Sequence, residues 1–150
     1  MKIALASDHA GFAEKERLKP LLRDLGVDYD DFGTGSEESV DYPDYAERVA
    51  NAVAAGRVEQ GVLLCGSGTG MAITANKVPG VRAAVAWSEE TARLAREHNN
   101  ANVLAIGART TPPNDIPGIV RAWFETSFAG GRHADRVEKI RKIEGGSAQG

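Results

Sequence analysis

Five short apolar runs alternate along this chain with longer stretches of helical periodicity, and this alternation constrains the fold most strongly. The runs occupy residues 2–7, 27–33, 61–65, 80–87 and 102–107, and helical patterns occupy residues 12–26, 44–56, 71–78, 88–99, 112–128 and 130–146. Strands that alternate with helices form βαβ units, whose parallel sheet is covered on both faces. We therefore predict a doubly wound, Rossmann-like three-layer α/β sandwich with a five-stranded parallel sheet and a C-terminal helix.

The length and the absence of a linker predict one domain over residues 1–144, followed by a small, polar, disordered tail at 145–150. Pro20 lies inside the first helical pattern, where we expect a kink or a break. A formal net charge of -3 argues against a general nucleic-acid binder. The single cysteine allows no internal disulfide, and the N-terminal apolar run is too short for a signal peptide or a membrane span. We expect a cytoplasmic protein with no nucleic-acid or membrane partner.

The stretch "LLCGSGTGM" joins the third predicted strand to a helix through glycines at every second position. Ligands of doubly wound sheets bind outside the carboxyl ends of the strands, where this loop lies. The loop lacks the Gly-Lys-Ser/Thr ending of a nucleotide P-loop, and its glycine spacing differs from the dinucleotide fingerprint. We predict that its backbone N–H groups form an anion cradle at Gly66, Ser67, Gly68, Thr69 and Gly70.

Other reactive side chains also stand at predicted element ends. Cys65 directly precedes the glycine loop, where the nearby helix N-terminus favours a thiolate over an inert buried thiol. His9 follows the first strand, and we place His98, at the end of the fourth helix, with it at the mouth of the sheet. Three arginines, which suit a phosphate monoester, are Arg109 after the fifth strand and Arg132 and Arg136 on the last helix. No cysteine–histidine pair has metal-ligand spacing, so we expect no metal.

A thiol base, preorganised amides, an imidazole and phosphate-binding arginines suit one reaction, the removal of a proton beside a carbonyl group. The negative charge moves to oxygen, where N–H donors stabilise it, and return of the proton to the neighbouring carbon converts an aldose into a ketose. This chemistry needs neither a redox cofactor nor a metal.

The chain resembles the type B ribose-5-phosphate isomerases, a group that includes the galactose-6-phosphate isomerase subunits. The resemblance runs from "IALASDHAGF" through "GTGSEESVDYPDYA", "GVLLCGSGTGMAITANKVPGVRAAV" and "AREHNNANVLAIGAR" to "GGRHADRVEKI". It implies an enediolate mechanism in which Cys65 is the base, His98 assists ring opening and the Gly66–Gly70 loop holds the enediolate oxygens. It also implies that Asp8, His9 and Asn99 contact sugar or phosphate, that the three arginines bind phosphate, and that a homodimer or a tetramer shares its sites between subunits.

Three alternatives stay open on the sequence alone. The substrate could be a six-carbon sugar phosphate, such as allose or galactose 6-phosphate, rather than ribose 5-phosphate. The Gly66–Gly70 loop could serve a nucleotide-binding module, or Cys65 and His98 could form the pair of a cysteine hydrolase. Asn100 stands where many relatives have aspartate, which would change the electrostatics beside His98.

Overall fold

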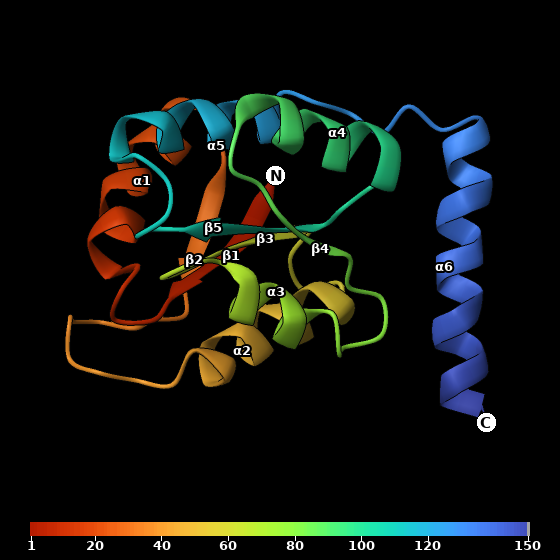
Figure 1. Cartoon of the computed structure of the whole chain (residues 1–150), viewed down its shortest axis with the longest axis horizontal. Coiled ribbons are helices and arrows are strands. Elements are labelled where there is room, and N and C mark those ends of the chain that lie inside the picture. The colour runs from red at the N-terminus through yellow and green to blue at the C-terminus, as the bar shows by residue number, and fades with distance from the viewer. Residues whose placement is uncertain (150) are drawn as a thin grey trace.

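A computed structural model describes residues 1–149 and shows a parallel five-stranded sheet between two layers of helices (Figure 1). The strands are β1 (Lys2–Ser7), β2 (Asp28–Asp31), β3 (Gln60–Cys65), β4 (Ala83–Val85) and β5 (Val103–Gly107). Their spatial order is β2-β1-β3-β5-β4, and every neighbouring pair is parallel. The predicted fold class is confirmed.

The helices are α1 (Phe12–Asp24), α2 (Tyr42–Ala54), α3 (Thr69–Ala75), α4 (Glu89–Asn99), α5 (Ile116–Phe124) and α6 (Arg132–Gln149), with a short 3₁₀ turn, η1 (Pro113–Asp115), before α5. One face of the sheet is covered by α1, α4 and α5, and the other by α2 and α3 (Figure 1). The C-terminal helix α6 stands at one side of the sandwich and contacts α4. Among the described residues, none of the helices combines the length and apolar character that crossing a bilayer requires.

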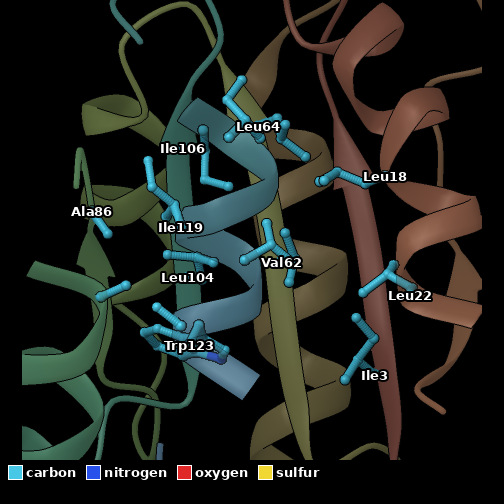
Figure 2. Close-up of a cluster of buried hydrophobic side chains, with 14 of the residues drawn as sticks. Ile3, Leu18, Leu22, Val62, Leu64, Ala86, Leu104, Ile106, Ile119 and Trp123 are labelled. Carbon is cyan, nitrogen blue, oxygen red and sulfur yellow. The ribbon is translucent and has the colours of Figure 1, made fainter. Parts of the chain in front are cut away.

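The two faces of the sheet bury side chains of different size. Leucines, isoleucines and Trp123 fill the layer beneath α1, α4 and α5 (Figure 2), and the Trp123 indole N–H donates to the buried Gln60 amide oxygen at 2.8 Å. Alanines and valines dominate the opposite layer, where α2 and α3 pack on the sheet together with Cys65 and Met71. Successive strand residues point to opposite faces, so Cys65 belongs to the α2 and α3 side.

Three details differ from the sequence-based expectations or stay untested. Pro20 does not break α1, because it lies on the exposed side of the helix, where water can hydrate the carbonyl that loses its partner. β4 is shorter than the apolar run 80–87 that predicts it, since it lies at the sheet edge and pairs only with β5. The tail at 145–150 and the domain boundary before it stay predictions, and Gly150 lies outside the described residues.

Candidate active site

The carboxyl ends of β1, β3 and β5 lie side by side at one end of the strands, because these strands are neighbours and parallel. Backbone hydrogen bonds join the segments that follow them. The Asp8 N–H donates to the Leu64 carbonyl at 3.1 Å, and the Arg109 N–H donates to the Gly66 carbonyl at 2.9 Å. The sequence therefore correctly predicts that the residues after these strands lie together.

The Cys65 thiol lies at the base of the glycine loop. Its side chain is only 4% exposed, and its Sγ accepts a hydrogen bond from the Gly68 N–H at 3.2 Å. The Arg109 side chain passes over the same loop, since its Cδ would lie 3.7 Å from a Cβ on Gly66. Thiol, loop amides and one of the three predicted arginines are thus brought together.

Two glycines of the loop are required by their surroundings. Gly68 has a φ of +78°, and a Cβ there would lie 3.0 Å from the Ile106 carbonyl carbon. A Cβ on Gly70 would lie 2.5 Å from the ring of Tyr42, which covers the loop from the start of α2. Tyr42 is a site residue that the sequence analysis missed. Its position in "VDYP", directly before Pro43, indicates only a loop next to a helix start.

Asp8 and His9 lie in the turn between β1 and α1. The Asp8 Oδ1 accepts hydrogen bonds from the N–H groups of Ala10 at 2.9 Å and Gly11 at 3.1 Å, and so holds the turn that starts the helix. The His9 Nδ1 accepts a hydrogen bond at 3.1 Å from the N–H of Val40, in the loop before α2. Asp8 is therefore held by its own turn, and His9 is held by the loop before α2.

The remaining predicted site residues lie near the amino ends of the strands. They are His98, Asn99, Arg132 and Arg136. α4 starts beyond the carboxyl end of β4 and returns to the amino end of β5, so His98 and Asn99 lie far from Cys65 within one chain (Figure 1). Placing His98 with His9 at the mouth of the sheet is wrong for a single chain. A helix that connects two parallel strands must end where the second strand begins.

His98 belongs to a second, cationic cluster with the first residues of α6. Its ring stacks on that of His133, with centroids 4.2 Å apart and planes 11° apart. Burial lowers the pKa of His133 below its ordinary value of 6.5, and the charges of His98, Arg132 and Arg136 lower it further. An anion bound here would relieve this repulsion between positive charges.

Two asparagines follow His98 and have different surroundings. Asn99 lines a cavity of about 460 Å³ between the β4 edge and α6, together with Arg82, Ile140 and Glu144. Asn100 caps α4 in the left-handed conformation, with a φ of +46°, which asparagine tolerates well. The Asn100 side-chain oxygen accepts a hydrogen bond from Arg96 at 3.2 Å rather than from His98. Within residues 1–149, no group of three histidine, cysteine or acidic side chains is arranged to hold a metal ion.

Comparison with known proteins identifies the family. Residues 3–140 match the family model described as Ribose/Galactose Isomerase. The chain belongs to this family. It is 47% identical over 143 residues to "Ribose-5-phosphate isomerase B" of Escherichia coli (strain K12), a match that covers 95% of this chain and 96% of that protein. It is 41% identical over 147 residues to "D-erythrulose-4-phosphate isomerase" of Pectobacterium atrosepticum, covering 96% and 95% of the two chains.

A solved structure agrees with the family assignment. The ribose-5-phosphate isomerase B of Clostridium thermocellum superposes with a TM-score of 0.95 at 47% sequence identity, over 98% of this chain and 99% of that one. The comparisons confirm the resemblance that the sequence motifs indicate, and with it an enzyme of the sugar-phosphate isomerase class. Membership of an isomerase family favours an isomerase over a nucleotide-binding module or a cysteine hydrolase, while the roles of the loop and the thiol stay predictions.

Proposed function

We propose that this isomerase interconverts ribose 5-phosphate and ribulose 5-phosphate in the cytoplasm, with Cys65 as the base. The observation that carries the proposal is the contact between the Cys65 sulfur and the Gly68 N–H, beside the carboxyl ends of β1, β3 and β5. A sulfur anion there removes the proton from C2 of the open-chain aldose. The pair of electrons forms the C1–C2 double bond of an enediolate, and the aldehyde oxygen takes the negative charge. The C2 hydroxyl proton then passes to that oxygen, and the protonated thiol returns its proton to C1, which leaves the C2 carbonyl of the ketose.

The backbone amides of Gly66–Gly70 stabilise the negative charge that develops on the enediolate oxygens. Such donors cost no reorganisation during the reaction, because the backbone already holds them in place. Gly68 cannot move away easily, since a strand backbone lies directly behind it. Asp8 and His9 lie beside the same strand ends and are assigned to sugar contacts, while Arg109 extends over the loop toward the phosphate.

We propose that two subunits complete each site. Cys65 lies at the carboxyl ends of the strands. The amino ends hold a second group of residues, so one copy has two separate half-sites; this group is His98, Asn99, Arg132 and Arg136. A two-fold symmetric homodimer can place the cationic half-site of each chain against the thiol of the other. In that arrangement His98 of one subunit moves the proton between ring oxygen and hydroxyl, and Arg132 and Arg136 bind phosphate. A tetramer would be a pair of such dimers.

Solvent exchange tests the proposed reaction. Incubation with ribose 5-phosphate in heavy water should place deuterium on C1 of ribulose 5-phosphate and on C2 of the recovered aldose. Cys65→Ala should lose roughly 10²–10⁴-fold of turnover, the usual contribution of a positioned general base. Lys77→Ala is the control, because this exposed side chain follows α3 and lies outside the glycine loop. Native turnover by folded Cys65→Ala would exclude the thiol as the base.

Subunit mixing tests the shared site. Cys65→Ala and His98→Gln should each be inactive as homodimers. After dissociation and random reassociation at equal concentration, half of the dimers carry one intact site, so about a quarter of the wild-type activity should return. No recovery, with mixed dimers shown by native mass spectrometry, would mean that both groups act within one chain. A panel of four-, five- and six-carbon aldose phosphates, compared by kcat/KM, tests the choice of sugar.

A further inference from the structure

Lys15, in the second turn of α1, is a buried charged group that the proposed reaction does not use. Its side chain is 1% exposed. Its ammonium donates to both oxygens of the Asp31 carboxylate at 2.8 Å each and to the Thr34 carbonyl at 2.7 Å. An ammonium has three hydrogens, so these contacts use its full donor capacity. A charge this far from water is stable only when it is paired and hydrogen-bonded in this way.

The Thr34 carbonyl marks the point where the chain leaves the sheet. The Ser7 N–H donates to the Gly33 carbonyl and the Thr34 N–H donates to the Ser7 carbonyl, both at 2.8 Å, so this segment still pairs with the end of β1. Beyond it, residues 35–41 form a loop that leads to α2. Lys15 therefore holds Thr34, the residue directly before the loop 35–41.

The far end of the same loop holds His9. The Val40 N–H donates to the His9 Nδ1 at 3.1 Å, so this nitrogen carries no proton. The neutral ring then has its hydrogen on Nε2, since the bond made by one ring nitrogen fixes the state of the other. The path of the loop thus decides whether His9 offers an Nε2–H donor at the edge of the site.

We propose that Lys15 is a positioning residue, which holds the Thr34 carbonyl so that the loop 35–41 presents Val40 to His9 and His9 presents Nε2–H to the substrate. The proposal rests on the isomerase function proposed above. It assigns Lys15 no contact with the sugar phosphate. Because Cys65 and Gly68 belong to other elements, loss of the Lys15 contact affects substrate binding and leaves the proton-transfer step intact.

The chain provides a matched control in Lys19, one turn further along α1. Its ammonium contacts the same Asp31 carboxylate at 2.7 Å and Glu16 at 2.9 Å, and it is 19% exposed. Its hydrogen bonds and ion pairs among the described residues do not include the loop. Lys19→Met therefore removes one of the two ion pairs of Asp31 and leaves the Thr34 carbonyl held by Lys15.

Steady-state kinetics and histidine NMR of the full-length enzyme test the role of Lys15. In Lys15→Met, KM for ribose 5-phosphate should rise about tenfold, the equivalent of one charge-assisted hydrogen bond, while kcat stays within about twofold. Long-range ¹H–¹⁵N spectra should show His9 as the Nε2–H tautomer in the wild type and as a mixture in the variant. With three histidines in the chain, His9→Gln assigns the signal. Lys19→Met should leave both KM and the tautomer unchanged.

Two outcomes would overturn the proposal. One is a folded Lys15→Met enzyme with wild-type KM and an unchanged His9 tautomer, since Lys15 would then only stabilise the fold. If Lys15→Met does not fold, Lys15→Gln replaces it, because its shorter, neutral side chain lacks the charged donor that holds the Thr34 carbonyl. Wild-type KM and tautomer in that variant would be the second outcome. The spectra need no substrate, so they test the positioning even if the wild type fails to isomerise ribose 5-phosphate.

Discussion

Replacement of Gly68 by alanine should damage both stability and turnover, since this residue is constrained in two ways. Its φ of +78° lies in the left-handed region, and a Cβ would approach the Ile106 carbonyl carbon at 3.0 Å and the Gly107 nitrogen at 3.1 Å. Both atoms belong to the backbone at the end of β5 and cannot rotate away. The Gly68 N–H is also the donor to the Cys65 sulfur.

The expected magnitudes follow from these contacts. The left-handed conformation costs an L-residue about 1–2 kcal/mol, and overpacking against fixed atoms adds about 1–3 kcal/mol. Gly68→Ala should therefore lose roughly 2–5 kcal/mol of unfolding free energy, or roughly 4–20 °C in Tm for a chain of this size. A displaced Gly68 N–H removes one loop donor to the negative charge that develops on the enediolate, worth about 1.5–3 kcal/mol, which lowers kcat by about 10- to 150-fold.

Gly56→Ala separates the two constraints. Gly56 has a φ of +72°, nearly that of Gly68, but a Cβ there would meet nothing within 4 Å, and it follows α2 away from the thiol. This variant should lose about 1–2 kcal/mol and keep its kcat. Urea unfolding and the isomerase assay measure both quantities. Gly68→Ala with the stability loss of Gly56→Ala and native turnover would refute the packing argument and the role of the Gly68 amide.

Three further changes have defined outcomes. Burial raises the pKa of Asp31, but hydrogen bonds from two lysines outweigh this effect and lower the pKa below 3.8. The ionised carboxylate therefore stabilises the fold above pH 3.8, and this contribution is lost as the pH falls through the lowered pKa. Acid titration of unfolding should show that the unfolding free energy of Asp31→Asn varies less than that of the wild type between about pH 4 and pH 2. Trp123→Phe should cost roughly 2–4 kcal/mol in urea, because it leaves a void and an unpaired Gln60 oxygen; a loss under about 0.5 kcal/mol would contradict the packing. Arg136→Gln should raise the pKa of His133 toward 6.5 in an NMR titration, and an unchanged value would remove Arg136 as a cause.

Local patterns in the sequence predict the elements well and their neighbours poorly. The Ser88 cap of α4 and the strand before Cys65 follow from residue types over a few positions, and the structure shows both. The insertion of β5 between β3 and β4 leaves no local signal, because it depends on which apolar faces pack together. The error in placing His98 has a different origin, since it treats the end of a helix like the end of a strand.

The role of Lys15 illustrates a second limit. The run "EKER" lies within the first helical pattern, and three of its four side chains have at least partial exposure. Lys15 is buried because Asp31 and the Thr34 carbonyl meet it from elements 16 and 19 residues away. A single sequence shows no pairing over that distance. The loop contact of Tyr42 is invisible for the same reason.

Main-chain donors hold three of the groups assigned to catalysis and binding, all of them near the carboxyl ends of the strands. The Cys65 sulfur is held by the Gly68 N–H, His9 by the Val40 N–H and Asp8 by the N–H groups of its own turn. A backbone donor stays in place when the side chain of its residue changes. The loop 35–41 can therefore vary in sequence, and so in the sugar it admits, without disturbing the thiol or the imidazole.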